Sequence, residues 1–354
     1  MVKVRSDFES ELSAAWLRKG WVSWAVWDIS VLYKWLVLLR RWLYVRGFFK
    51  SYKLAVPVVV VGNVIAGGAG KTPTVIGIAQ HLQAKGWCVG VVSRGYGRQT
   101  APTLGSSTAN HKLAKNTALE VLPSSSPSEV GDEALLIART LHAPVFVANN
   151  RHLAATSLLN IHKNVNIILC DDGLQHLALQ RDVEVVVFDD RGVGNGWTLP
   201  AGPLREPWPR RDTSKQIVLN TGAAPRVDGF KAQRRLADDA LRQDGSRLPL
   251  ASLLGKPIHA LAGIAQPEAF FGMLRQQLGA HGLTLAHTQS LPDHYDFKSY
   301  IAPLDADIWQ LCTEKDADKL WLHCPHALAL PLRQTIEPAM LEALDARLAQ
   351  WQTH

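Results

Sequence analysis

Hydrophobic residues along the chain form short continuous runs that alternate with stretches of helical spacing. The segment VPVVVVG, residues 56–62, is a continuous β-branched run, which is typical of a strand buried on both faces. After a glycine-rich loop, residues 71–86 place apolar side chains at helical spacing, at Val75, Ile78, Ala79 and Leu82. Gly86 stands where a helix C-terminal cap belongs, and residues 87–97 predict a second strand. This order of strand, loop, helix and strand predicts an α/β fold.

The same alternation continues toward the end of the chain. Residues 143–148 (APVFVA) and 165–170 (VNIILC) have the pattern of further buried strands. The segment SKQIVLNTG, from residue 214, has the pattern of a strand that leads away from the first unit. Residues 256–288 then have the pattern strand, helix, strand, and residues 337–351 predict a closing helix. We therefore predict three parts: an N-terminal helix over residues 1–50, a core over 51–212, and a smaller C-terminal α/β domain over 213–354 that contributes the second wall of a cleft.

The first fifty residues are rich in tryptophan, with six of the twelve in the chain. At 3.6 residues per turn, one stripe contains Trp24, Trp27, Val31, Trp35 and Leu38. Basic residues gather at the far end, at Arg40, Arg41, Arg46, Lys50 and Lys53. Tryptophan is favoured at the depth of lipid headgroups, and anionic lipid attracts Lys and Arg. We therefore expect a membrane-anchoring amphipathic helix that binds membrane lipid.

Two alternatives are compatible with this N-terminal stretch. An amphipathic helix packed on the protein's own core, with tryptophan as bulk, has the same periodicity. A single membrane span is less favoured, because Asp28 and Lys34 interrupt the apolar run before it reaches the roughly 18 residues that a spanning helix needs.

The composition narrows the class of protein but not its function. With 354 residues, of which 47% are hydrophobic and 19% charged, the chain is an ordinary globular protein, and its length favours two domains over one. A net charge of +7 favours anionic partners, which include phosphate, nucleic acid and acidic lipid. The four cysteines form no C-x-x-C pair, and the polar N-terminus shows no cleavable signal. We expect a reduced, cytoplasmic protein without a cysteine metal site.

The glycine-rich loop has the features of a phosphate-binding loop. In VIAGGAGKTP, residues 64–73, the glycines let backbone N–H groups turn inward, and the start of the following helix adds its positive dipole end. We expect Lys71 to contact the β- and γ-phosphates and Thr72 to offer its hydroxyl to Mg²⁺. Ile65 stands where the usual pattern has glycine, but this change removes no anion ligand. The predicted nucleotide-binding residues are Ile65, Ala66, Gly67, Gly68, Ala69, Gly70, Lys71 and Thr72.

Acidic residues stand at two places where such a loop needs them. Asp171 and Asp172 follow the strand at 165–170, in position to hold a metal ion or its water, although Asp-Gly is also a common turn. Asp132 and Glu133 stand at the head of a predicted helix, where helix capping alone is a serious alternative to catalysis.

Other polar residues follow the ends of the predicted strands. They are Arg94, Tyr96, Arg151, Gln175 and His176. In open α/β sheets the carboxyl ends of the strands line one crevice, so we expect these side chains to meet the phosphate loop and the carboxylates there. A phosphate loop, acidic pairs and arginines at one edge suit phosphoryl transfer to an alcohol.

Taken together, the motifs closely resemble those of the tetraacyldisaccharide 4'-kinase family, also called lipid A 4'-kinases. The segments that carry the resemblance are GNVIAGGAGKTP (62–73), VVSRGYGR (91–98), VGDEALLIAR (130–139), CDDGLQH (170–176), GNGWTLPAGPLREP (194–207), ALAGIAQPEAFF (260–271) with LPDHYDF (291–297), and TEKDADKL (313–320). The resemblance implies a P-loop NTPase-like αβα core with a smaller second domain, and ATP and Mg²⁺ as cofactors. It also implies transfer of the γ-phosphate to the 4'-hydroxyl of an acylated glucosamine disaccharide 1-phosphate, giving lipid IV-A, at the cytoplasmic face of the Gram-negative inner membrane.

The same resemblance implies roles for individual residues. Asp132 matches the catalytic base, paired with His294, and Lys71 matches the phosphate contact. The metal neighbourhood falls on Thr72, Glu133, Asp171, Asp172 and Gln175. The remaining cleft residues are Arg94, Tyr96, Arg151, His176, Arg205 and Glu206. Tyr295 stands where many members have a second histidine, so only His294 can fill that role here.

Two other functions are compatible with parts of the pattern. A membrane-bound P-loop switch or motor ATPase would share the loop, but its ATP consumption would not depend on a lipid acceptor. A nucleic-acid binder is compatible with the positive charge. However, the basic and aromatic residues are concentrated in an apolar stretch, and no recognisable reader module is present. We therefore expect no nucleic-acid partner.

Overall fold

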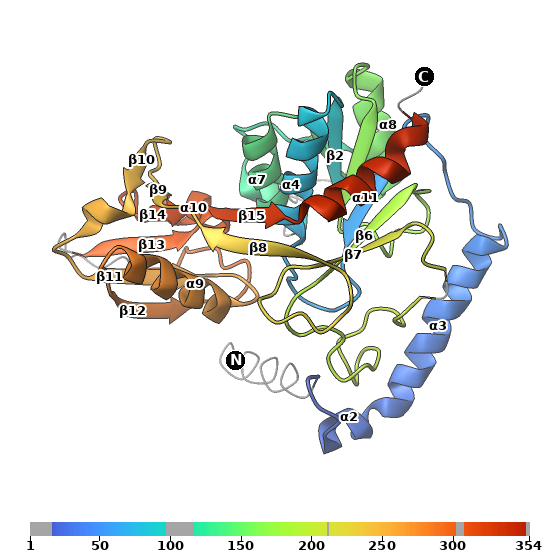
Figure 1. The fold of residues 1–354 in the computed structure, drawn as a ribbon, viewed down its shortest axis with the longest axis horizontal. Helices are drawn as coiled ribbons and strands as arrows, with labels where there is room; N and C mark the ends of the chain where they lie inside the picture. Colours follow the sequence, from blue (N-terminus) through green and yellow to red (C-terminus); the bar gives the residue numbers. More distant parts are fainter. Residues whose placement is uncertain (1–15, 97–116, 211, 302–307, 352–354) are drawn as a thin grey trace, which may run out of the picture.

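The computed structural model describes residues 16–96, 117–210, 212–301 and 308–351 (Figure 1). Two β-sheets lie side by side, each with helices packed on it, and a long helix stands at the margin of the larger one. This arrangement is the α/β class that the sequence predicts. The first fifteen residues of the predicted N-terminal part lie outside the described residues.

The larger sheet has nine strands among the described residues, in the order β15-β8-β7-β6-β1-β5-β2-β4-β3. Its strands are β1 (Val58–Gly62), β2 (Val89–Ser93), β3 (Leu119–Glu120), β4 (Val145–Val147), β5 (Ile167–Asp171), β6 (Val183–Phe188), β7 (Gln216–Asn220), β8 (Phe230–Leu236) and β15 (Leu332–Ile336). The pairs from β8 across to β4 are parallel, whereas β3 and β15 are antiparallel to their neighbours. Every residue of β1 is buried between β5 and β6, as its β-branched run predicts.

Helices pack on this sheet and place the phosphate loop at its edge. They are α4 (Lys71–Ala84), α6 (Pro127–Val130), α7 (Asp132–Leu141), α8 (Arg151–Ile161) and α11 (Pro338–Leu348), which the short η2 (Ala349–Trp351) follows. Helix α4 packs on α7 and on the central strands, α8 on β2 and β4, and α11 on β7 and β8. Because β1 ends where the loop begins and α4 starts where it ends, the loop lies at the carboxyl edge of the sheet, beside the end of β5.

The smaller sheet has six strands among the described residues, in the order β10-β9-β14-β13-β11-β12. Its strands are β9 (Asp239–Leu241), β10 (Arg247–Pro249), β11 (Ile258–Ala262), β12 (Leu285–Ser290), β13 (Trp309–Thr313) and β14 (Leu328–Leu330). Its helices are η1 (Leu250–Leu253), α9 (Pro267–Ala280) and α10 (Glu314–Leu320). The antiparallel pair β8 and β15 runs from the larger sheet toward the smaller one (Figure 1).

This topology corrects the boundary expected at residue 213. The range 213–354 was predicted to form the smaller domain, whereas β7, β8, β15 and α11 belong to the larger unit. Strand β7 continues the parallel sheet because all five of its residues pair with β6, from Gln216 with Glu184 to Asn220 with Phe188. The chain returns through β15 after completing the smaller sheet. The smaller unit therefore extends from β9 to β14.

The N-terminal helices α2 (Trp21–Ala25) and α3 (Trp27–Val45) bury serines and expose aromatic and aliphatic residues. Ser23 and Ser30 are buried, whereas Trp35 is 66% exposed and Leu39 is 52% exposed. This pattern argues against the alternative in which the tryptophan stripe packs on the protein's own core. Within the described residues, no helix is both long enough and apolar enough to cross a bilayer.

Candidate active site

The backbone of the phosphate loop turns at two of its glycines. Gly67 and Gly70 have φ of 88° and 80°, the left-handed region that favours glycine. Lys71 Nζ donates to Asn63 Oδ1 (3.3 Å) and lies 3.6 Å from Asp172 Oδ1. The lysine charge is therefore held at the mouth of the loop by one amide and one carboxylate.

The entry of the loop is fixed by packing. Ile65 is fully buried and forms a β-bridge with Leu204, while the N–H of Ala66 donates to Pro203 O (2.8 Å). Neither Ile65 nor Ala66 lines the cavity beside the loop, in contrast to the other six predicted nucleotide-binding residues. The isoleucine that departs from the usual pattern thus belongs to the core and leaves the phosphate side of the loop unchanged.

Asp172 lines the cavity at the end of β5. Two cations contact it: Arg205 Nη1 approaches both of its oxygens at 3.4 Å, and Lys71 Nζ lies 3.6 Å from Oδ1. Burial raises the pKa of Asp172, but Lys71 and Arg205 outweigh this effect and hold the pKa below its ordinary value. Asp172 is therefore a carboxylate that remains charged at neutral pH.

Asp171 is buried directly behind Asp172. One of its oxygens accepts a hydrogen bond from Ser93 Oγ (3.4 Å), and the other has no partner among the described residues. Burial, together with the charges of Glu133 and Asp172, raises the pKa of Asp171 to about 7. An unpartnered buried carboxylate oxygen next to a phosphate loop is the kind of group that a cation or its water stabilises.

The residues around the loop fit a magnesium ion that phosphate helps to hold. Mg²⁺ usually takes one or two carboxylates together with waters and substrate phosphates. Thr72, Glu133 and Asp172 line the cavity and offer a hydroxyl and two carboxylates. Within the described ranges, no group of three or more His, Cys, Asp or Glu side chains could hold a metal ion. Phosphate oxygens and water would therefore complete the coordination.

The structure brings Asp132 and His294 together, although they are 162 positions apart and belong to different units. His294 Nδ1 lies 3.0 Å from Asp132 Oδ2, and Lys319 Nζ donates to the same oxygen (2.8 Å). The loop that carries His294 has a φ of 61° at this residue, and its N–H donates to Gly263 O (3.0 Å). The ring of Tyr96 lies against the imidazole, with 5.0 Å between the ring centroids.

A second lysine of α10 completes this wall. Lys315 Nζ lies 3.5 Å from Glu133 Oε1, 3.3 Å from Asp293 Oδ1 and 3.3 Å from His294 Nε2. Because the ammonium group can only donate, Nε2 of His294 accepts this bond and Nδ1–H donates to Asp132. Burial lowers the pKa of Lys315, but Glu133 and the neighbouring aspartates outweigh it and raise the pKa.

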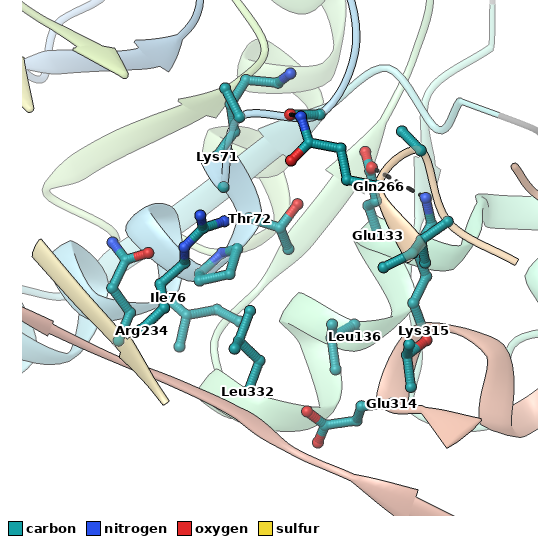
Figure 2. A pocket seen from close by; sticks show the side chains of 18 of the residues that line it. Lys71, Thr72, Ile76, Glu133, Leu136, Arg234, Gln266, Glu314, Lys315 and Leu332 are labelled. Carbon is teal, nitrogen blue, oxygen red and sulfur yellow. Dashed lines mark hydrogen bonds and ion pairs between the residues drawn. The ribbon is translucent and has the colours of Figure 1, made fainter. Parts of the chain in front are cut away.

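These elements enclose a cavity of about 560 Å³ between the two units (Figure 2). Its polar end is the phosphate loop with Arg94, Tyr96, Glu133, Asp172 and His294. Its other end is lined by the apolar side chains of Ile76, Leu136, Leu236, Phe270, Met273 and Leu332, with the charged side chains of Arg234 and Glu314 among them (Figure 2). Arg234 of β8 reaches into the cavity near Thr72 (Figure 2). A polar end and an apolar end in one cavity suit a ligand with a phosphate chain and a flat apolar part.

A family model described as Tetraacyldisaccharide-1-P 4'-kinase matches residues 22–349. The chain belongs to this 4'-kinase family. A tetraacyldisaccharide 4'-kinase of Acidovorax sp. (strain JS42) is 52% identical over 346 residues, which cover 97% of this chain and 96% of the relative. The one from Bordetella petrii is 39% identical over 371 residues, covering 99% and 98%. The resemblance seen in the sequence is thereby confirmed.

A solved member of the 4'-kinase family has the same fold. The crystal structure of the "apo" form of LpxK from Aquifex aeolicus in complex with ATP matches with a TM-score of 0.73 and 27% identity, covering 93% of this chain and 99% of that one. This match confirms that the present chain has the P-loop kinase fold that its sequence predicts.

Other predicted cleft residues lie behind the cavity wall. Gln175 Nε2 donates to Asn63 O (3.2 Å) and to Glu206 Oε1 (2.8 Å), and Glu206 pairs with Arg210 (2.7 Å). Gln175 and Glu206 do not line the cavity. They join the chain at the start of the phosphate loop to the segment that carries Arg205, so the structure gives them a supporting position.

Arg151 and His176 form a second support below Asp172. Arg151 is buried and its Nη2 donates to Asp172 O (3.3 Å), while its backbone N–H donates to His176 Nε2 (3.3 Å). An imidazole nitrogen that accepts a hydrogen bond carries no proton. Burial and the charges of Arg151 and Arg181 lower the pKa of His176 to about 4.

This environment of His176 predicts a pH dependence of stability. In the unfolded chain the imidazole titrates near its ordinary pKa of about 6.5, so between pH 6.5 and pH 4 the unfolded state binds a proton that the folded state excludes. The free energy of unfolding should therefore fall as the pH is lowered through this window. Above the window the imidazole is neutral in both states, so His176 should cause no pH dependence there. The variant His176→Gln, whose amide can still accept the Arg151 N–H, should lose less stability between pH 7 and pH 5 in urea unfolding. Equal losses in the two proteins would contradict the assignment.

Sequence reasoning missed several polar residues of the site. Lys315 and Lys319 belong to the TEKDADKL segment, which carried the resemblance but received no role. Arg191 and Arg234 were not singled out, because a lone basic residue carries no local signal. Gln266 belongs to the ALAGIAQPEAFF segment, which carried the resemblance but in which this residue received no role. Only the folded arrangement places them beside the loop.

Proposed function

We propose that this protein transfers the γ-phosphoryl group of ATP to the 4'-hydroxyl of tetraacyldisaccharide 1-phosphate, which gives lipid IV-A in lipid A biosynthesis. The observation that carries the proposal is the convergence at one cavity of a phosphate loop and His294, which is bonded to Asp132. The loop suits a triphosphate, and the pair suits removal of a hydroxyl proton. The family assignment and the ATP complex of the Aquifex relative support this choice of substrates.

Asp132 would act as the base. A sugar hydroxyl is a poor nucleophile, and a carboxylate can accept its proton as the new bond to phosphorus forms and the bond from the γ-phosphorus to ADP breaks. Both donors, His294 and Lys319, bond to Oδ2, so Oδ1 is the oxygen that faces the incoming proton in this proposal. Burial raises the pKa of Asp132, but the hydrogen bonds from His294 and Lys319 outweigh it and lower the pKa, which keeps the carboxylate charged.

Charge on the triphosphate would be balanced from two sides. Lys71 would contact the β- and γ-phosphates, and the N–H groups of the loop would bind the phosphate oxygens. Thr72, Glu133 and Asp172 would hold Mg²⁺, with Asp171 and Gln175 behind them. Bound Mg²⁺ would supply neutralisation of charge at the phosphate oxygens. The apolar end of the cavity would receive the base of the nucleotide.

The N-terminal helices would place the protein on the cytoplasmic face of the Gram-negative inner membrane as a peripheral protein. The exposed side chains of α3 include Ile29, Leu32, Trp35, Leu36, Leu39, Trp42 and Val45. The basic residues Arg40, Arg46 and Lys50 lie at its C-terminal end and just beyond it. Such a surface gains free energy by entering the headgroup region, where lipid replaces water around the apolar side chains. The acylated substrate is itself a membrane lipid, so this location would bring acceptor and cavity together.

Two acidic substitutions on this helix test the membrane proposal. The double variant Trp35→Glu/Leu39→Glu should bind vesicles of anionic phospholipid at least about tenfold more weakly, because it removes two apolar contacts and adds two like charges to an anionic surface. Co-sedimentation with the vesicles measures this. A matched control is Ile161→Glu, which changes a 61% exposed residue at the end of α8 and should bind as the wild type does. Undiminished binding of the double variant would contradict the proposal.

A P-loop ATPase without a lipid acceptor is the main rival function. The pairing of Asp132 with His294, which lines the same cavity as the loop, favours a kinase, because a carboxylate that can accept a hydroxyl proton suits an alcohol as the second substrate. The two functions differ in what ATP consumption depends on. In a detergent assay, ADP release should rise strongly on addition of the acylated disaccharide 1-phosphate, whereas release that is indifferent to this lipid would favour the ATPase.

A further inference from the structure

The backbone carbonyls on the outer side of the phosphate loop are bound by one guanidinium group. A loop that turns its N–H groups toward phosphate must turn carbonyls outward, and these need donors. Arg191 supplies them, since Nη1 donates to Ala66 O (3.0 Å) and Nη2 donates to Gly68 O (2.9 Å). A Cβ on Gly67, between these two residues, would lie 3.2 Å from Nη1, so the guanidinium packs directly against the loop.

Asp189 fixes the orientation of this guanidinium. Its carboxylate accepts from Arg191 Nε at 3.1 and 3.0 Å, from Nη2 at 2.7 Å, and from the Arg191 backbone N–H at 3.0 Å. Asp189 is only 3% exposed, at the end of the buried strand β6. A charged pair in this position is strong and directional, because a planar guanidinium matches a carboxylate with two parallel bonds. The arginine therefore presents its two free N–H edges to the loop in one fixed direction.

The smaller unit contributes to the same cluster through Gln266. Its Nε2 donates to Asp189 Oδ2 (3.0 Å) and to Gly68 O (3.4 Å), the carbonyl that Arg191 also binds. Gln266 directly precedes α9, and Figure 2 shows it beside the turn that carries Lys71. The Cβ of the adjacent Ala265 would lie 3.7 Å from a Cβ on Gly68. One carbonyl of the phosphate loop is thus shared by donors from both units.

We infer that Arg191, held by Asp189, is a positioning residue that keeps the phosphate loop in its phosphate-binding shape, and that Gln266 couples this shape to the placement of the smaller unit. The inference rests on the proposed function only in taking ATP as the ligand of the loop. Neither side chain needs to touch ATP. Their effect passes through the carbonyls of Ala66 and Gly68 to the N–H groups on the opposite side of the same peptides.

The test compares binding of Mg·ATP with use of the lipid acceptor, in the full-length protein. Arg191→Met keeps a similar volume but cannot donate. It should raise the Kd for Mg·ATP, measured by calorimetry without acceptor, by about 10- to 100-fold, because hydrogen bonds from a charged group are lost. In the kinase assay, KM for ATP should rise by a similar factor while KM for the acceptor stays unchanged. Exposed Arg226, which makes none of these contacts, provides the control Arg226→Met.

Gln266→Leu tests the coupling without disturbing the buried pair. It should raise the Kd for Mg·ATP by about three- to tenfold, since one neutral donor is lost. Gln277→Leu makes the same change on the same helix, at a residue that bonds Asp238 far from the loop, and should bind ATP as the wild type does. In the double variant, the loss of binding free energy for Mg·ATP should be smaller than the sum of the losses in Arg191→Met and Gln266→Leu, because both side chains donate to Gly68 O.

The outcomes separate this inference from the proposed function. Weakened ATP binding in both variants supports the inference even where the wild type fails to phosphorylate the lipid. An unchanged Kd for Mg·ATP in a folded Arg191→Met protein overturns it. Should Arg191→Met not fold, Gln266→Leu decides: an ATP affinity equal to that of Gln277→Leu overturns the coupling, and a selective loss supports it.

Discussion

Replacement of Asp132 by asparagine should lower kcat by about 10²- to 10⁴-fold, the usual contribution of a general base. The amide has nearly the shape of the carboxylate and can still accept a bond from His294 or Lys319, but it cannot take up a proton. Binding of Mg·ATP should persist, because the loop and Lys71 are untouched. Steady-state kinetics, together with calorimetric titration of Mg·ATP, measures both quantities.

A matched control for this substitution lies on α10. Asp318 pairs with Arg139 across the contact between α10 and α7, without contact to His294. Asp318→Asn should therefore keep kcat within about twofold. It removes one partly exposed ion pair, and such pairs contribute little to stability. Near-normal turnover in Asp132→Asn would contradict the assignment of the base.

Replacement of Lys71 by methionine should lower kcat/KM for ATP by at least about 10²- to 10³-fold, the loss that follows removal of one preorganised group facing transition-state charge. The change also removes one of the cations near Asp172, so the carboxylate would face the phosphates with less compensation. Kinetics at varied ATP concentration measures the loss.

Lys85→Met is the control at the other end of the same helix. This lysine is partly exposed and lies 3.7 Å from Asp345, away from the cavity. Its replacement should leave kcat/KM for ATP unchanged. Equal effects of the two substitutions would show that loss of positive charge on α4, rather than the place of Lys71, determines ATP use.

Much of the larger sheet could be predicted from the sequence because its strands are continuous apolar runs. β1, β2, β4 and β5 follow the segments that the pattern indicates, and the loop and α4 occupy their predicted places. The boundary at residue 213 was not predictable in this way. Strand β8 has the sequence FKAQRRL, whose charged residues indicate an exposed segment. It is half-buried because β7 pairs with its start and β15, almost a hundred residues later, pairs along its other edge.

The N-terminal helix was predicted from its stripe of tryptophans, but the manner of its attachment was not. Ser30 Oγ accepts from the N–H of Ala201 (2.7 Å), and Tyr33 donates to Arg205 O (2.9 Å). These contacts are polar and leave no hydrophobic pattern. The tryptophan stripe is exposed at Trp35 and Leu38, whereas Trp24 and Trp27 also contact Trp197 of the larger unit.

The candidate site was predicted in two different ways. Periodicity and the glycine pattern located the phosphate loop and the carboxylates at the end of β5. The contact of Asp132 with His294 followed only from the family resemblance, because no local pattern relates residues on separate units. The donors that bind the outward carbonyls, Arg191 and Gln266, were given no role from the sequence, because a side chain that bonds to backbone carbonyls leaves no local pattern.

Lipid kinase activity is tested most directly by following labelled γ-phosphate from Mg·ATP into lipid, with tetraacyldisaccharide 1-phosphate in detergent micelles. We expect label on the 4'-position of the lipid with the wild-type protein, little label with Asp132→Asn, and none when the acceptor is omitted. Steady loss of ATP without label on the lipid, at a rate that does not depend on the acceptor, would show that the protein is an ATPase and not a lipid kinase.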